Sequence, residues 1–205
     1  ANPGIALGSC FAEEIGGWLE RLHFPLQVNP FGTLYNPFSV AHALERLLDN
    51  AVYTRDDLFE HDGLWHCFDF HSRFSGPDAS TVLETMNAAT VSAAQAMERL
   101  DFLMVTFGTA QTWFLTDRRT VAANCHKLPH DRFEHRLAGP DEIIETWSAV
   151  LSRVYTLRPQ LNVIISVSPV RYLRDNPITN CFSKAQLHTA VQELCRRVYV
   201  LSDFS

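Results

Sequence analysis

The chain has 205 residues, of which 46% are hydrophobic and 20% are charged, and its formal net charge is −6. A chain of this length fits one domain with a sizeable core better than two small domains. The acidic balance and the lack of any lysine or arginine run argue against a nucleic-acid or membrane partner, because either would require a concentrated basic face.

The cysteines indicate the cellular compartment. Their number is odd and their spacing irregular, which favours reduced thiols over a disulfide framework and therefore predicts a cytoplasmic protein. They are Cys10, Cys67, Cys125, Cys181 and Cys195. No apolar stretch reaches the roughly 20 residues that a membrane-spanning helix needs.

In the first part of the chain, short apolar runs alternate with helical patterns. The predicted elements are a buried strand at residues 5–7, a helix at 13–22, a strand at 24–28, a loop at 29–37 and a helix at 39–48. Residues 52–75 are irregular and rich in histidine, aspartate and aromatic residues, with a strand expected at 65–70. A long helix follows within residues 79–99.

The second part continues the alternation. The predicted elements are a central strand at residues 102–107, a short hairpin from 112–115 and 121–123, a helix at 140–155, a second central strand at 161–167 and a helix at 183–197. The apolar run at residues 198–201 predicts a strand that has just begun. Together with the abrupt entry into the first strand, it leads us to expect a fragment of a longer polypeptide.

This alternation predicts an α/β fold, a three-layer α/β/α sandwich with a central, mainly parallel sheet, formed by residues 1–205 as a single domain. Such sheets bind ligands outside the carboxyl ends of their strands. The loops at residues 8–10, 108–111 and 168–171 all follow predicted strands, so we expect the site among them.

The turn Gly8-Ser9-Cys10 lies between the first strand and the first helix. A nucleophile placed there gains from the first-turn N–H groups and from the positive end of the helix dipole, which favour a thiolate or an oxyanion. The ordinary alternative is a strand-to-helix turn in which Ser9 caps the helix and Cys10 is a small buried filler.

The run Gly8-Ser9-Cys10-Phe11-Ala12 resembles the signature of the GSCFA family, within the SGNH-hydrolase (GDSL-like) group. The resemblance extends over nearly the whole chain, through residues 29–37, 65–72, 106–110, 124–127, 168–171 and 183–185. It implies a flavodoxin-like sandwich of the SGNH type. SGNH enzymes carry a Gly-Asp-Ser turn, and laying it on this turn without a gap puts Cys10 at the nucleophile position. A shift of one residue makes Ser9 the nucleophile.

The resemblance also implies an oxyanion hole, built from the nucleophile N–H, a glycine after the second strand and an asparagine after the third. Gly32 matches the second donor, or is simply a turn glycine between two prolines. The third position holds Ala110 instead of asparagine, so we expect Thr109, Gln111 or Asn124 to substitute.

The resemblance places the activating base in an Asp-x-x-His segment near the end of the domain. Residues after Ser183 contain no such segment, so the pattern predicts that it lies beyond Ser205, and that the stretch given lacks its native C-terminal segment. His71 and His126 are the internal candidates for substrate contact or for a local base. Arg171, just past a central strand, is a candidate partner for an anionic substrate group.

Two histidine clusters raise the question of zinc. One contains His61, His66, Cys67 and His71, and the other contains Cys125, His126, His130 and His135. Neither has a firm metal-binding spacing, so we expect histidines that line a pocket or lie on the surface, with no metal and no cofactor. Trp65 and Trp113 are interpreted as core residues in preference to platforms for sugar rings.

The function expected from these features is ester chemistry. We expect an esterase or acyltransferase that acts on a small ester or an acylated carbohydrate through a covalent Cys10 or Ser9 intermediate. The alternative is a degenerate SGNH-like domain that binds a glycan or a protein without turnover.

Overall fold

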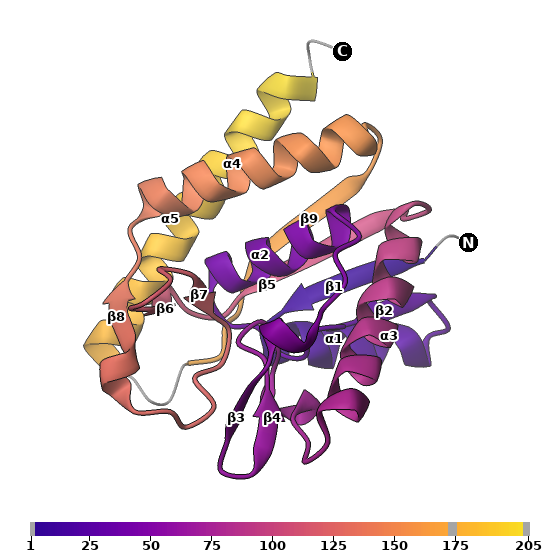
Figure 1. The fold of residues 1–205 in the computed structure, drawn as a ribbon. Helices are drawn as coiled ribbons and strands as arrows, with labels where there is room; N and C mark the ends of the chain where they lie inside the picture. Colours follow the sequence, from indigo (N-terminus) through magenta and orange to yellow (C-terminus); the bar gives the residue numbers. More distant parts are fainter. Residues whose placement is uncertain (1–2, 172–175, 203–205) are drawn as a thin grey trace.

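The computed structural model describes residues 3–171 and 176–202. Its central sheet has four strands in the order β2-β1-β5-β9, and each neighbouring pair is parallel. The strands are β1 (Gly4–Gly8), β2 (Leu26–Val28), β5 (Phe102–Phe107) and β9 (Asn162–Val167). Strand β5 is paired on both edges, as its continuous apolar run predicts. The loops that follow β1, β5 and β9 therefore meet at one edge of the sheet (Figure 1).

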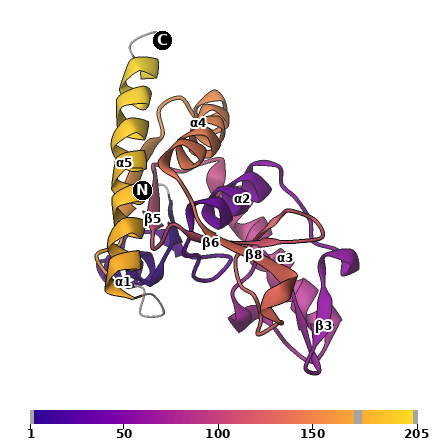
Figure 2. The same ribbon diagram turned by 90° about the vertical axis from the view of Figure 1, so that its left-hand side faces the viewer.

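Helices cover both faces of this sheet, which confirms the predicted three-layer sandwich (Figure 2). On one side lie α1 (Cys10–Arg21) and α5 (Pro177–Ser202), and on the other α2 (Pro37–Leu48), α3 (Ala79–Met97) and α4 (Pro140–Leu157). Trp147 of α4 is fully buried, with its ring 5.0 Å from that of Phe107. Its indole N–H donates to the Pro37 carbonyl at 3.0 Å, so the core locks α4 to both β5 and α2.

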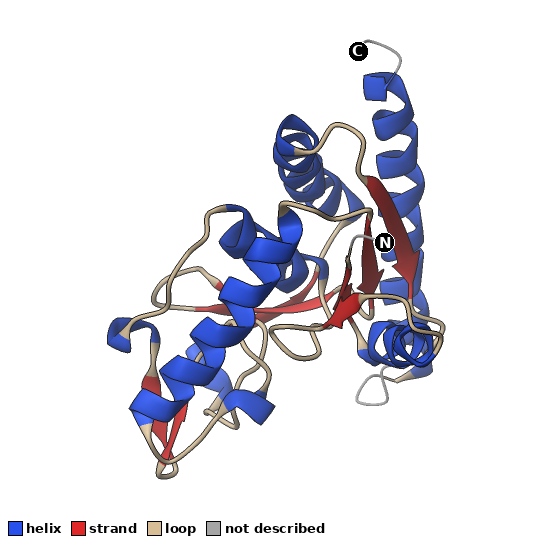
Figure 3. Ribbon diagram, turned by 90° about the vertical axis from the view of Figure 1, so that its right-hand side faces the viewer, coloured by secondary structure: helices blue, strands red, loops and turns tan. Residues whose placement is uncertain are grey.

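Two small antiparallel sheets lie beyond the carboxyl ends of the central strands (Figures 1 and 3). One is the hairpin of β3 (Phe59–His61) and β4 (Leu64–His66). The other has the order β7-β6-β8 and contains β6 (Gln111–Leu115), β7 (Val121–Ala122) and β8 (Phe133–Leu137). The predicted hairpin near residue 118 is confirmed by the β6–β7 pair. The charged sequences of β3 and β8 gave no strand signal.

Several predicted boundaries differ from the structure. The strand expected at residues 65–70 is Leu64–His66, and the strand expected at residues 24–28 is Leu26–Val28. Helix α1 begins at Cys10 instead of residue 13, because Ser9 already has the extended backbone of an N-cap residue. Helix α5 begins at Pro177, where the Asn176 side chain accepts from the Thr179 N–H at 2.9 Å. It continues to Ser202, so the strand expected at residues 198–201 is wrong. An apolar run that follows an amphipathic helix without a break simply extends the helix.

Candidate functional site

The Gly8-Ser9-Cys10 turn is packed tightly against strand β5. Gly8 has a φ of 137°, and a Cβ atom built there would lie 2.1 Å from the Thr106 carbonyl oxygen. Its N–H donates to Asn29 Oδ1 at 2.9 Å, and the Ser9 N–H donates to the Thr106 carbonyl at 3.1 Å. Only glycine fits at this position, because any side chain would collide with the backbone of β5.

Ser9 and Cys10 differ in exposure. Ser9 is 1% exposed, and its side chain makes no capping hydrogen bond to α1. In α2 and α3, by contrast, the side chains of Asn36 and Asp78 do cap the helix. The Ser9 hydroxyl is buried and has no hydrogen-bond partner within the described part of the chain. Cys10, the first residue of α1, is partly exposed. The first-turn N–H groups of α1 thus lie beside a thiol with no hydroxyl cap.

The loop after β2 supplies Gly32 and a buried residue that the sequence did not single out, Asn29. Gly32 has a φ of 80°, and its N–H donates to the Asn29 carbonyl at 2.7 Å, which closes a turn. The Asn29 side chain is fully buried beside Gly8, and its Nδ2 has no partner among the residues described. The signal for Asn29 was its place at the start of the motif Asn-Pro-Phe-Gly, directly after a strand.

Thr109, a predicted oxyanion donor, is instead part of the joint between the loop after β5 and helix α5. Its N–H donates to the Tyr35 carbonyl at 2.9 Å, and its hydroxyl is 3.0 Å from that of Ser183. The Ser183 hydroxyl also accepts from the Ala110 N–H at 2.8 Å. Thr109 is 3% exposed, so this side chain organises the loop.

Lys184 was not predicted as a site residue. Its Nζ donates to the Gly108 and Ser168 carbonyls at 2.6 Å each, where strands β5 and β9 have just ended. Partial burial lowers the pKa of Lys184, and the negative charge that Cys10 carries as a thiolate opposes that shift. Lys184 is therefore within electrostatic reach of the thiol.

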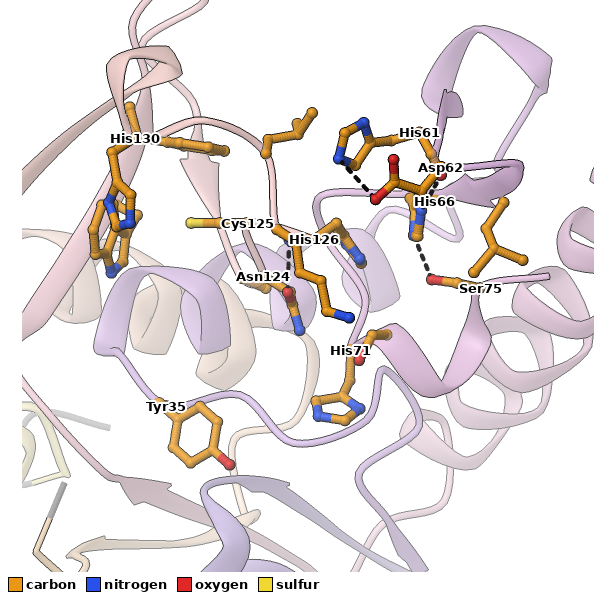
Figure 4. Close-up of a pocket in the computed structure, with 17 residues that line it drawn as sticks. Tyr35, His61, Asp62, His66, His71, Ser75, Asn124, Cys125, His126 and His130 are labelled. Carbon is orange, nitrogen blue, oxygen red and sulfur yellow. Dashed lines mark hydrogen bonds and ion pairs between the residues drawn. The ribbon is translucent and has the colours of Figure 1, made fainter. Parts of the chain in front are cut away.

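The structure also contains a cavity of about 600 Å³ (Figure 4). It is enclosed by the β3–β4 hairpin, the segment around His71 and the loop that follows β7. Its lining includes three of the predicted residues, His71, Asn124 and His126, but not Cys10, Gly32, Thr109 or Arg171. Arg171 is exposed. His71, Asn124 and His126 thus form a cavity group, and Ser9 and Cys10 form a turn group, while Thr109 and Arg171 belong to neither.

Tyr35 connects the two groups. It lines the cavity, and in Figure 4 it lies with His71 at one end, away from His61 and His130. Its backbone carbonyl accepts from the Gly108 N–H at 2.7 Å. A Cβ atom built at Gly108 would lie 3.2 Å from the Tyr35 ring and 3.1 Å from Ser9 Cβ. Gly108 therefore packs against both Ser9 of the turn and Tyr35 of the cavity wall.

The cavity histidines have defined hydrogen-bonding roles. His71 Nδ1 accepts from the Arg73 N–H at 3.2 Å, so neutral His71 carries its proton on Nε2 and presents a donor. Burial, aided by the charge of Arg73, lowers the pKa of His71. His126 Nε2 donates to the Cys67 carbonyl at 2.8 Å, and burial lowers the pKa of His126 to about 4. Both rings are thus neutral near pH 7.

A second polar cluster lies under α2, and it does not line the cavity. Asp69 Oδ2 accepts from the Tyr53 hydroxyl at 2.9 Å and from His42 Nε2 at 3.0 Å. Burial raises the pKa of Asp69, but the hydrogen bonds from His42 and Tyr53 outweigh it, and the net pKa is lowered. The hydrogen bond to Asp69 raises the pKa of His42. The pair ties α2 to the segment after β4.

Across residues 3–171 and 176–202, no group of three or more histidine, cysteine, aspartate or glutamate residues is arranged to hold a metal ion. No helix in the same ranges is both long and apolar enough to cross a membrane.

Comparison with curated proteins and with solved structures each found no significant similarity. The profile of the GSCFA family, in contrast, matches residues 4–204, which include the turn, the glycine loop, the cavity and Lys184. The chain therefore belongs to the GSCFA family.

Proposed function

We propose that this chain is an SGNH-like esterase or acyltransferase that forms an acyl-enzyme on Cys10. The observation that carries the proposal is the environment of Cys10, a partly exposed thiol at the start of α1, where the preceding serine does not cap the helix. Membership of the SGNH group is part of the same proposal. It is supported by the parallel sheet and by the placement of the turn directly after β1.

Cys10 is a better nucleophile candidate than Ser9 because of exposure. The Ser9 hydroxyl is buried, whereas Cys10 is partly exposed. In the proposed reaction the Cys10 thiolate attacks the ester carbonyl, and the N–H groups of the first turn of α1 stabilise the oxyanion. The alcohol leaves, and water or a second alcohol then takes the acyl group from sulfur.

The cavity supports an alcohol or carbohydrate moiety as the other half of the substrate. Its lining combines the flat ring of Trp113 with polar groups, among them Asn124 and the Nε2–H donor of His71. Aromatic surfaces with a few directed polar groups are typical of sites for small polar ligands. Two buried groups beside Gly8, Ser9 Oγ and Asn29 Nδ2, have no partner among residues 3–171 and 176–202 and add polar capacity next to the turn.

The first test uses p-nitrophenyl and alkyl esters with Cys10→Ala and Ser9→Ala variants. Both are made in a Cys181→Ala/Cys195→Ala background, because these exposed thiols would react with activated esters. We expect Cys10→Ala to lower kcat/KM by at least about 100-fold and to abolish a hydroxylamine-sensitive adduct on residue 10. Ser9→Ala is expected to keep most of the activity. Full activity in Cys10→Ala would overturn the assignment of the nucleophile.

The alternative is a non-catalytic domain that binds a glycan or a protein. It is favoured by two observations: Cys10 does not line the cavity, and the Gly32 N–H is already engaged by Asn29. If neither ester turnover nor an adduct is detected, while calorimetry shows partially acetylated oligosaccharides binding and His126→Gln weakening that binding, this alternative replaces the enzyme.

A further inference from the structure

Lys184 is held in an unusual position. The chain contains only two lysines, Lys127 and Lys184, and Lys184 lies in the second turn of α5. Its amine is half-buried and bonded to two backbone carbonyls, those of Gly108 and Ser168. No carboxylate in the described part of the chain forms an ion pair with it. Backbone carbonyls therefore hold this amine in the place that a carboxylate or solvent usually takes.

The two carbonyls belong to the strand ends beside the nucleophile turn. Strand β1 pairs with β5, and Gly8 lies opposite Thr106 in that pairing. Gly108, two residues further, packs against Ser9, since a Cβ atom there would lie 3.1 Å from Ser9 Cβ. The Lys184 amine is thus bonded to Gly108, which packs against Ser9, and Ser9 directly precedes Cys10. Its electrostatic interaction with Cys10 follows from this placement.

The arrangement of bonds and hydrogen bonds around Lys184 Nζ suggests the function of the amine. Cε occupies one of the four tetrahedral positions of Nζ, and the two carbonyls take two N–H groups. The fourth position holds a lone pair in the neutral amine and a third proton in the ammonium form. The carbonyls can hold the amine in both states, and they bind the ammonium more strongly because its N–H donors are charged. They leave one position free to exchange a proton.

We propose that Lys184 is the catalytic base of the Cys10 reaction, a role that rests on the proposed function. The Cys10 S–H bond breaks, its electron pair stays on sulfur, and the Lys184 lone pair takes the proton. The resulting ammonium lies beside the thiolate and stabilises it. When the tetrahedral adduct collapses, the ammonium returns this proton to the departing alkoxide, which leaves as an alcohol and restores the neutral amine.

Burial supports this role, because it lowers the pKa of Lys184 and a lysine partly removed from water gives up its proton more readily. His71 is less suited to be the base. Its Nδ1 is already an acceptor for the Arg73 N–H, so neutral His71 presents a proton on Nε2 instead of a lone pair.

The test measures the thiol itself, independently of ester turnover. Iodoacetamide alkylation of Cys10 is followed by peptide mass spectrometry from pH 5 to 10 in the wild type and in Lys184→Met, Lys184→Gln and Lys184→Arg. The exposed Cys195 thiol of each molecule is the internal reference, and Lys127→Met is the matched lysine control. Circular dichroism melting identifies any variant that does not fold.

We expect Lys184→Met and Lys184→Gln to alkylate Cys10 about tenfold more slowly at pH 7 and to move its pH profile to higher pH. Lys127→Met is expected to match the wild type. Lys184→Arg is expected to keep fast alkylation by charge alone, but to lose hydrolysis of alkyl esters, whose leaving group needs a proton. Wild-type alkylation in folded Lys184→Met and Lys184→Gln overturns the proposal.

The two proposals fail separately. If Lys184→Met shifts the alkylation of Cys10 but no ester is turned over by the wild type, the lysine–thiol pair stands and the esterase assignment falls. If Cys10→Ala abolishes turnover but Lys184→Met leaves both alkylation and turnover unchanged, the nucleophile stands and the base does not.

Discussion

Gly8 sets the path of the backbone into the candidate nucleophile turn. Its φ of 137° and its contact with the Thr106 carbonyl bring Ser9 and Cys10 against the end of β5. A side chain at this position meets rigid sheet backbone, which cannot move aside. The residue therefore determines both the stability of the strand end and the direction in which the thiol is presented.

We predict that Gly8→Ala destabilises the fold by at least about 2 kcal/mol, because alanine adds both a strained φ and a clash at 2.1 Å. Gly17→Ala is the matched control, since a Cβ atom at this helical position meets nothing within 4 Å. It is expected to raise stability by about 0.5 kcal/mol through helix propensity. Urea denaturation of both variants measures the difference. Equal stability of the two variants would refute this account of Gly8.

At the level of elements, His126 joins the loop after β7 to the segment after β4. Its ring centre is 4.6 Å from that of His66, and its Nε2–H is bonded to the Cys67 carbonyl. His66 is itself held by the Ser75 hydroxyl at 2.7 Å and by the His61 carbonyl at 3.2 Å. The contact between the two small sheets thus depends on a neutral, buried imidazole.

This contact predicts an acid-sensitive fold. Because the pKa of His126 is about 4 in the folded chain and about 6.5 when unfolded, the unfolded state binds more protons between these values. The stabilisation is complete above pH 6.5 and is lost as the pH falls toward 4. We expect the protonation of His126 in the unfolded state to lower the free energy of unfolding by about 2 kcal/mol when the pH falls from 7.5 to 5.

Urea denaturation at the two pH values checks this, with His126→Gln as the comparison. The glutamine variant is expected to be less stable at pH 7.5 but to lose less on acidification. The raised pKa of His42 acts in the opposite sense, because its stabilisation is present at low pH and is lost as the pH rises through that pKa. If the free energy of unfolding of His126→Gln falls as much as that of the wild type on acidification, the assignment to His126 is contradicted.

For the molecule as a whole, the junction of α5 with the sheet brings distant parts of the chain to the site. Ser183 and Lys184 both bond to the loop after β5, at sequence separations of 73 and 76 residues. Lys184 also bonds to the loop after β9, 16 residues away. This junction fixes the loop whose Gly108 packs against both Ser9 and Tyr35. Helix α5 therefore acts as part of the site as well as a covering layer of the sandwich.

We predict that Ser183→Ala destabilises the fold by about 1–3 kcal/mol, because it leaves the buried Ala110 N–H without an acceptor. Ser148→Ala is the matched control, since the buried Ser148 hydroxyl has no partner in the described chain. Its removal is expected to be neutral or slightly stabilising. Thermal melts of both variants measure the contrast, and a neutral Ser183→Ala would show that the junction is not held by this hydroxyl.

The sequence by itself determined the sandwich, the parallel strand pattern and the turn after β1. These features are local, because they depend on apolar runs, helical periodicity and a glycine directly after a strand. The sequence also indicated which loops meet, since the carboxyl ends of parallel strands share one edge. The family signature around Gly8-Ser9-Cys10 matched the profile that covers residues 4–204.

Only the tertiary structure decided which side chains share a space. One cavity is lined by His71, Asn124 and His126 together with Tyr35. Thr109 does not line it, because its hydroxyl packs against that of Ser183. The exposure of the thiol of Cys10 and the burial of the hydroxyl of Ser9 were also invisible in the sequence, where the two are adjacent. Lys184 reaches the turn only because α5 packs back across the ends of β5 and β9, a contact that depends on the whole fold and not on any local pattern.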